Sequence, residues 1–266
     1  MLYSPKIPVI HLGDLEAQPH PIVAFGREYP SGHLVEGHHH GRAQLIYASK
    51  GIMRVDTPEG IWVVPPMRAI WVPPNVTHEI RASSTVHLRT LFIQPALRGS
   101  LPGKCCVIEV SPLLKELILR MVAYAGWGEA ARPPAHMIEL ILDEIRSVRV
   151  LPTHVPLPND ARMLKICQSI LANPADSRTC AQWGSGVGAS SRTLERLFQR
   201  EMGMSFRIWR QQVRLLAALS RLAAQTPISV VALDLGYQSP SAFTAMFKRA
   251  LGCPPREFFG HDITAR

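Results

Sequence analysis

The chain lacks the features of membrane, exported and disordered proteins. It contains no apolar run of the roughly 18 or more residues that a membrane span needs, and residues 1–13 lack the basic segment and apolar core of an export signal. Five cysteines, two of them adjacent, give no disulfide framework. A composition of 47% hydrophobic and 18% charged residues excludes long disorder. These absences predict a cytoplasmic globular protein of one or two domains that binds no membrane.

Acidic residues are scarce in the second part of the chain. Residues 160–266 hold 14 Lys and Arg against 7 Asp and Glu, whereas residues 1–159 hold 15 against 13. Most of the net charge of +9 therefore lies in the C-terminal part. A basic region of this size is typical of a phosphate-binding surface, although charge alone also fits an acidic membrane or a solvated face. The charge favours nucleic acid as a partner without identifying it.

Helical periodicity is absent from residues 44–94. Short runs rich in β-branched and aromatic residues alternate there with turns that contain Gly, Pro or Asn. The runs are 44–49, 52–56, 61–64, 69–72, 78–82 and 86–93. This regular spacing predicts an antiparallel sandwich or barrel, which we place at about 20–95.

Helical periodicity begins at about residue 111. Two apolar stripes follow, made of Leu114, Leu117, Ile118 and Met121, and of Ile138, Ile141, Leu142 and Ile145. They predict a pair of helices at about 111–148. We interpret this pair as a dimerisation element, and packing of the stripes onto the barrel is the alternative. Three prolines within 151–158 exclude a helix and a central strand. We therefore place a linker at 151–159, between a domain at 1–150 and a second at 160–266.

The second domain has helical periodicity throughout. Asp160 is placed to cap a helix that ends at Asn173, and a longer helix is expected at about 205–224. On either side of the longer helix one pattern occurs twice, 49 residues apart. It consists of Ser190, Leu194, Leu197, Phe198, Arg200 and Gly203, and of Ser239, Phe243, Met246, Phe247, Arg249 and Gly252. Each copy follows a short helix and a glycine turn, which predicts two helix-turn-helix units.

Three segments match a known family pattern. Two lie within residues 160–260 and read ASSRTLERLFQREMGMSFRIWRQQVRLLAALSRL and ISVVALDLGYQSPSAFTAMFKRALGCPPREFF; the third reads HHHGRAQLIYASKGIMRVDTPEGIWVVPPMRAIWVPPNVTHEI. The first two resemble the AraC/XylS-type bacterial transcription regulators, and the third is similar to the cupin-type sensor domain of one branch of that family. The resemblance implies a two-domain α+β fold. An N-terminal antiparallel, cupin-like β-barrel with a helical pair would precede a C-terminal all-α domain with two helix-turn-helix units.

The outward face of the second helix of each unit is the expected DNA-reading surface. An α-helix fits the major groove of B-DNA, where Arg reads guanine and Gln reads adenine. The expected DNA contacts are Ser190, Arg192, Thr193, Arg196 and Gln199 in the first unit, and Gln238, Ser239, Ser241, Thr244 and Lys248 in the second. Ser190 and Ser239 are also expected to cap their helices. A solvated face is the alternative for the other residues.

One departure from the family pattern lies in the first short helix. Relatives usually have alanine or longer helix-forming residues where this chain has Gly184 and Gly186. An interior glycine costs about 1 kcal/mol relative to alanine. The first helix-turn-helix unit is therefore expected to be looser than the second, and to order fully only on DNA.

Histidines gather in the cupin-like segment. As the resemblance implies, His38, His40 and Gln44 have the spacing of the first cupin metal motif, and His78 stands where the second motif places its histidine. Gln44 replaces a glutamate, which removes the anionic ligand and lowers the affinity for a divalent cation. We therefore interpret the cluster as an effector pocket formed by His38, His40, Gln44, Trp62, Trp71 and His78. A metal site at His38, His40 and His78 remains the alternative, because three imidazoles can hold zinc or iron.

The sequence thus predicts a sequence-specific DNA-binding transcription regulator, an activator or a repressor, that a small molecule modulates. Its expected partners are double-stranded promoter or operator DNA, a small-molecule effector and a second copy of the chain, with RNA polymerase as a further candidate. No cofactor and no catalytic residue is expected. A metal-dependent cupin enzyme, an oxygenase or isomerase with a fused helical domain, is one rival class, but it does not explain the repeat. The other is a non-specific architectural nucleic-acid-binding protein.

Overall fold

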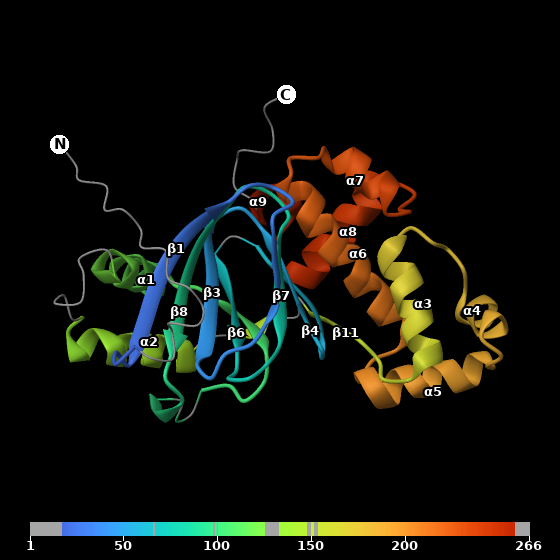
Figure 1. Ribbon diagram of the computed structural model, residues 1–266. Helices are drawn as coiled ribbons and strands as arrows, with labels where there is room; N and C mark the ends of the chain where they lie inside the picture. Colours follow the sequence, from blue (N-terminus) through green and yellow to red (C-terminus); the bar gives the residue numbers. More distant parts are fainter. Residues whose placement is uncertain are drawn as a thin grey trace. The chain divides into compact units, whose positions relative to one another are not determined.

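The computed structural model describes residues 18–65, 67–97, 99, 101–125, 133–147, 150–151 and 154–258. Both ends of the predicted domain pair, residues 1–17 and 259–266, lie outside this set. The described residues divide into two compact units, the first within 18–151 and the second made of 154–258 together with Glu59–Ile61 (Figure 1). Within these residues no helix has the length and hydropathy to cross a bilayer.

Two β-sheets dominate the N-terminal part of the chain. One has the strand order β1-β8-β3-β6-β9-β10, with β1 (Ile22–Tyr29), β3 (Ala43–Lys50), β6 (Arg68–Val72), β8 (Val86–Ile93), β9 (Cys106–Glu109) and β10 (Val150–Leu151). The other has the order β11-β5-β4-β7-β2, with β2 (Leu34–His38), β4 (Met53–Thr57), β5 (Gly60–Val64), β7 (His78–Ala82) and β11 (His154–Pro156). All six runs predicted as strands form strands. Among the described strands no pairing joins the two sheets, so the cupin-like domain is a two-sheet sandwich rather than a closed barrel.

Strand alternation divides the apolar residues of the six-stranded sheet between two cores. Ile46 and Ile70 lie in a core that includes Val55, Val64 and Ile80 of the five-stranded sheet. Leu45, Tyr47 and Trp71, which point to the opposite face, lie in a second core. Because successive side chains of a strand face opposite ways, β1, β3, β6, β8 and β9 each supply both cores.

The predicted helical pair covers that second core. It consists of α1 (Pro112–Ala125) and α2 (Ala135–Ser147). Leu114 and Ile118 of α1 and Ile141 and Ile145 of α2 are buried with the outer residues of the six-stranded sheet. The apolar stripes are therefore used in packing onto the sheet, which is the alternative to their use in a dimer interface.

The second unit is helical, as its periodicity predicts. Its helices are α3 (Ala161–Ala172), α4 (Cys180–Gly186), α5 (Ser191–Met202), α6 (Phe206–Ala223), α7 (Ile228–Asp234), α8 (Pro240–Leu251) and α9 (Pro255–Phe258). Asp160 caps α3 by accepting hydrogen bonds from the backbone N–H groups of Arg162 and Met163. The long helix α6 begins after Ser205, whose side chain accepts a hydrogen bond from the N–H of Ile208. Its buried stripe includes Phe206, Trp209, Val213 and Leu216, as predicted.

The 49-residue repeat corresponds to two copies of one structure, α4 with α5 and α7 with α8. The second helix of each copy begins at a serine cap, Ser190 or Ser239, and ends at a left-handed glycine, Gly203 or Gly252. A side chain at such a positive φ would be strained, which explains glycine at both ends. The fold therefore contains the two predicted helix-turn-helix units, joined by α6.

Candidate nucleic-acid interface and histidine cluster

Helix α5 presents a polar face opposite a buried one. Leu194, Leu197 and Phe198 are buried, while Arg192, Arg196 and Gln199 are exposed on the opposite side. Spacings of three and four residues place the exposed side chains on one face. Three long polar side chains thus lie together on the exposed face of α5, while the apolar residues of its opposite face hold the helix in the core.

The start of α5 is fixed by hydroxyl groups. The Ser190 side chain accepts a hydrogen bond from the Thr193 N–H at 3.1 Å, and the two hydroxyl oxygens lie 2.9 Å apart. Ser190 therefore acts as the predicted cap. Thr193 is half-buried. Both side chains lie beside the face that carries Arg192 and Arg196.

Helix α8 repeats this arrangement with smaller side chains. Gln238 in the preceding turn is exposed, as are Ser241 and Lys248 on the helix, whereas Thr244 is half-buried. Ser239 caps the helix by accepting a hydrogen bond from the Ala242 N–H at 3.2 Å. The short side chains let a helix approach a groove closely, and the lysine carries the positive charge of this face.

Two arginines of α6 hold the loop that leads into α4, the first helix of the first helix-turn-helix unit. The Arg214 Nε donates to the carbonyl oxygen of Pro174 at 2.9 Å. Arg210 donates to the carbonyl oxygen of Arg178 at 2.8 Å and to that of Asp176. Hydrogen bonds from a charged group each contribute about 1.5–3 kcal/mol. These contacts connect the loop between α3 and α4 with the helix that joins the two units.

Gly184 has a structural role that the sequence did not predict. A Cβ atom at this position would lie 2.3 Å from the carbonyl oxygen of Ala189, and the Ala189 N–H donates to the Gly184 carbonyl at 2.9 Å. The backbone of the turn therefore passes too close for a side chain. Gly186, by contrast, has nothing within 4 Å of such a Cβ. The interpretation of both glycines as mere helix weakeners is wrong for Gly184.

The histidine cluster of the first unit is compact and largely buried. One ring nitrogen from each of His38, His40 and His78 lies within 4.8 Å of the other two. His40 and His78 are buried and His38 is half-exposed, so the cluster reaches solvent at His38. The Gln44 Oε1 atom lies 3.1 Å from His40 Nε2 and 2.9 Å from His78 Nε2, and the Gln44 amide nitrogen donates to Thr90 Oγ1 at 2.9 Å. The structure thus brings together the three histidines and the glutamine that the sequence singled out.

The backbone fixes which ring nitrogens face the centre. The Nδ1 atoms of His38, His40 and His78 lie 2.8, 2.6 and 2.9 Å from the carbonyl oxygens of Glu36, Arg42 and Val76. A carbonyl only accepts, so each Nδ1 carries a proton and, in the neutral ring, Nε2 keeps its electron pair. Histidines that bind metals typically hold the other ring nitrogen in this way.

Electron pairs therefore meet at the Gln44 side chain. With Oε1 facing the imidazoles, three acceptors converge, and this arrangement is favourable only with a cation or an added proton between them. Burial lowers the pKa of His78 to about 4, with smaller contributions from the neighbouring histidines, so an added proton is disfavoured there at neutral pH. Rotating the amide by half a turn would instead let its NH₂ group donate to His40 and His78. The cluster is therefore arranged to receive a cation or a hydrogen-bonding ligand.

The two tryptophans predicted as pocket walls lie in two different cores. Trp62 lies in the core between the sheets, on the same side as Ile46 and Phe92. Trp71 lies in the other core, beneath α1 and α2, and its indole N–H donates to the Pro102 carbonyl at 2.8 Å. Placing Trp71 in the pocket is therefore wrong, because residue 71 faces away from the interior side of its strand.

Two neighbours of the cluster were missed. Thr90 is fully buried and donates to the Leu45 carbonyl while accepting from Gln44. The Phe92 ring contacts the His40 ring edge-on, with centroids 4.9 Å apart. Both stand on β8 opposite β3, in register with Ile46 and Gln44. The available sequence sign was a threonine at a position in step with the inward-facing Val86, Leu88 and Phe92 of β8.

The fold and these two sites define the class of the protein, a double helix-turn-helix protein with a separate β-sandwich domain. Comparison with known families agrees. Residues 20–145 match the AraC-like ligand binding domain, and residues 183–261 match a helix-turn-helix domain.

Relatives of known function place the chain in a family. It is 33% identical over 227 residues to the HTH-type transcriptional regulator NimR of Escherichia coli, covering 85% of this chain and 83% of NimR. It is 29% identical over 137 residues to the arabinose operon regulatory protein of Escherichia coli, covering 50% and 47% of the two chains. The structure of ToxT from Vibrio cholerae matches 90% of this chain and 98% of ToxT at 11% identity, with a TM-score of 0.39. The chain belongs to the AraC family of DNA-binding transcription regulators, with a ligand-binding domain at its N-terminal side.

Proposed function

We propose that α5 and α8 read two neighbouring major-groove segments of one operator. The observation that carries this proposal is the pair of capped helices with exposed polar faces, Arg192, Arg196 and Gln199 on one and Ser241 and Lys248 on the other. The joining helix α6 has 18 residues, about 27 Å at 1.5 Å per residue. Successive major-groove segments on one side of B-DNA lie about 34 Å apart, so one chain can span both.

Within this proposal the side chains have different tasks. Arg192, Arg196 and Gln199 contact base edges, because their long polar groups match the hydrogen-bonding pattern of the major groove. Lys248 and the serine caps contact phosphates. The remaining side chains, those of Thr193, Gln238, Ser241 and Thr244, complete the two contact surfaces.

Binding to the DNA upstream of its own gene tests this proposal. The protein should retain that DNA about 10³-fold better than a scrambled duplex at about 150 mM salt. Arg196→Ala should reduce specific binding roughly 10- to 100-fold, as expected for a lost bidentate base contact. Arg200→Ala is the matched control, because Arg200 is on the same helix and pairs with Glu201 at 3.0 Å. Equal retention of upstream and scrambled DNA, or equal losses in the two variants, would contradict the proposal.

We propose that the N-terminal β-sandwich domain binds the effector at the histidine cluster. The pocket residues in this proposal are His38, His40, Gln44, Trp62 and His78. We assign effector binding and dimerisation to residues 1–150, a linker to 151–159 and DNA binding to 160–266. A ligand that prefers one placement of the DNA-binding domains would change operator affinity by its differential affinity for the two states.

Thermal-shift screening of small molecules tests this effector site. A true effector should raise the melting temperature of the wild type, lose that effect in His78→Ala, and change operator affinity at fixed salt. His154→Ala is the control, because His154 is another partly buried histidine, in β11 and outside the cluster. A tightly bound ligand that depends on His78 but leaves operator affinity unchanged would refute the coupling.

We further propose that the regulator acts as a cytoplasmic homodimer without enzymatic activity, and that RNA polymerase is a candidate partner. Two leucines on the helical pair support a dimer, since Leu113 of α1 is 49% exposed and Leu140 of α2 is 44% exposed. Leu113→Glu with Leu140→Glu should shift the sedimentation of the protein from dimer to monomer. An unchanged sedimentation coefficient would refute this interface.

A divalent metal ion is a second candidate ligand of the cluster, favoured by the three Nδ1 atoms that carbonyl oxygens hold. The His38, His40 and His78 imidazoles would supply its nitrogen ligands, and the neutral Gln44 oxygen a weaker one. Zinc or manganese titrated into metal-free protein should bind with one site per chain. Gln44→Glu should strengthen this binding by adding a negative charge, and His40→Ala should abolish it. Absence of binding to both wild type and Gln44→Glu would leave the small molecule as the ligand.

A further inference from the structure

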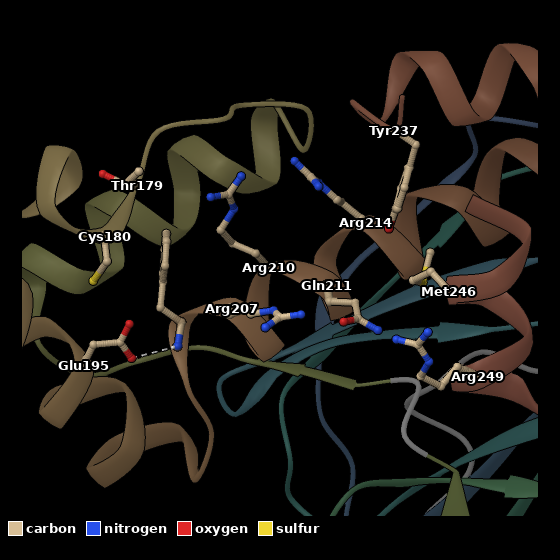
Figure 2. A pocket seen from close by; sticks show the side chains of 11 residues that line it. Thr179, Cys180, Glu195, Arg207, Arg210, Gln211, Arg214, Tyr237, Met246 and Arg249 are labelled. Atoms are coloured by element: carbon tan, nitrogen blue, oxygen red, sulfur yellow. Dashed lines mark hydrogen bonds between the residues drawn. The ribbon is translucent and has the colours of Figure 1, made fainter. Parts of the chain in front are cut away.

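A basic pocket lies within the C-terminal helical domain, between its two helix-turn-helix units. It has a volume of about 510 Å³. Figure 2 shows Thr179, Cys180 and Glu195 of the first helix-turn-helix unit on one side of the pocket. Tyr237, Met246 and Arg249 of the second helix-turn-helix unit lie on the other side. Side chains of α6, among them Arg207, Arg210, Gln211 and Arg214, lie between them (Figure 2). The pocket is thus lined by both DNA-reading units and by the helix that joins them.

Positive charge dominates this pocket. Four of its lining residues are arginines, and Glu195 is the one carboxylate among its lining residues. The Glu195 side chain already accepts a hydrogen bond from the Phe206 N–H at 3.4 Å. Arg207 and Arg249 are exposed, and no carboxylate within the described part of the chain forms an ion pair with either. Burial and the neighbouring Arg214 lower the pKa of Arg210, as expected where cations crowd together.

The pocket adjoins both predicted DNA-reading faces. Glu195 lies on α5 within one turn of Arg192, Arg196 and Gln199, and Arg249 follows Lys248 on α8. A duplex that filled both recognition sites would present the sugar-phosphate backbone between its two contacted major-groove segments. Arginine is well suited to that backbone because its planar guanidinium donates two parallel hydrogen bonds to phosphate oxygens.

We propose that this pocket is a phosphate-binding site on α6 that takes a phosphate group of the DNA backbone between the segments that α5 and α8 read. This inference rests on the proposed function and adds a third contact to it. Arg207 and Arg249 bind the phosphate directly, while Arg210 and Arg214, through their carbonyl partners, hold the loop before α4 in place. The contact is independent of base sequence, so it adds affinity and fixes the register of the protein on the duplex without reading bases.

Salt-dependent DNA binding by the full chain tests the inference. The variant Arg207→Gln with Arg249→Gln avoids the two arginines that hold the loop. It should weaken binding to the upstream DNA and to a scrambled duplex by the same factor, and reduce the slope of log affinity against log salt by about 1 per arginine. Arg256→Gln is the matched control, because Arg256 is an exposed arginine on α9 that does not line the pocket. Its effect on the slope should be less than half of that of the double variant.

The outcomes separate this inference from the proposed function. Loss of discrimination between the two duplexes in the wild type would refute sequence reading, yet the slope on the scrambled duplex would still test the pocket. An unchanged slope in the double variant refutes the DNA phosphate. Pyrophosphate added without DNA identifies the other source of the same chemistry. If it raised the melting temperature of the wild type but not of the variant, while the slope stayed unchanged, the pocket would bind a free phosphorylated molecule instead. No response in either measurement overturns the phosphate site altogether.

Discussion

Replacing each glycine of α4 with alanine should have opposite effects. The Gly186 position is open, with nothing within 4 Å of an added Cβ, so Gly186→Ala should stabilise the first helix-turn-helix unit by up to about 1 kcal/mol through helix propensity. At Gly184 the added atom would lie 2.3 Å from the Ala189 carbonyl oxygen. That oxygen belongs to the backbone, so the turn itself must move.

The second helix-turn-helix unit gives a bound on the free-energy cost of Gly184→Ala. There the Tyr237 N–H donates to the Ala232 carbonyl at 2.9 Å, the same bond that Ala189 makes to Gly184. Such a turn can therefore be built around a methyl group, and the cost is that of shifting one turn. Overpacking of this kind costs about 1–3 kcal/mol, and 1 kcal/mol corresponds to roughly 4–8 °C in the melting temperature of a domain of about 100 residues.

Hydrogen exchange on the full chain measures the two effects locally. Peptides that cover α4 and the start of α5 should exchange more slowly in Gly186→Ala and faster in Gly184→Ala, while peptides of α7 and α8 should change little in either variant. Equal stabilisation by both substitutions would refute the close approach at Gly184. It would mean that both glycines only weaken the helix, as their positions in the sequence suggested.

Three further substitutions test caps and buried polar contacts. Asp160→Ala should lower the free energy of unfolding by about 1 kcal/mol at neutral pH. Hydrogen bonds from Arg162 hold the folded pKa of Asp160 at about 2, below its ordinary value of 3.8. The unfolded chain therefore takes up the proton first, and the difference between wild type and variant should shrink as pH falls from about 4 to about 2, but not between pH 5 and 8. Ser239→Ala should cost the second unit about 1 kcal/mol in thermal unfolding, and Ser239→Gly clearly less, since glycine is a tolerated cap. Gln44→Leu should destabilise the N-terminal β-sandwich domain by about 1–3 kcal/mol in denaturant, because the buried Thr90 hydroxyl loses the hydrogen bond that the Gln44 amide donates to it; unchanged stability would show that the amide is not held there.

Much of the C-terminal helical domain could be predicted, because short-range sequence signals specify its helices. Serine caps, apolar residues at spacings of three and four, and glycines at helix ends lie within one turn of the feature they specify. The repeat then gave two units, since the same short-range pattern occurs around Ser190 and around Ser239. The contacts of Arg210 and Arg214 with the loop before α4 could not be predicted, because residues more than 30 positions apart in the sequence make them.

The packing of the N-terminal β-sandwich domain explains why Trp71 was wrongly predicted as a wall of the effector pocket. Both faces of the six-stranded sheet are buried, one against the other sheet and one against α1 and α2. Residues 69–72 of β6 therefore form a continuous apolar run, and alternation alone does not reveal which face is the interior one. Trp71 was placed on the wrong face for this reason. The polar residues His40, Gln44 and His78 were placed together because their spacing carried the resemblance to a cupin motif.

The central claim is that one chain reads two adjacent major-groove segments through α5 and α8. Inserting 5 base pairs between the two segments of the operator, about half a helical turn, tests it most directly. The rigid connection through α6 predicts that affinity falls at least about 10-fold and that footprinting protects a single segment per chain. Full affinity with both segments protected would contradict this account, because the two units would then bind independently of their spacing.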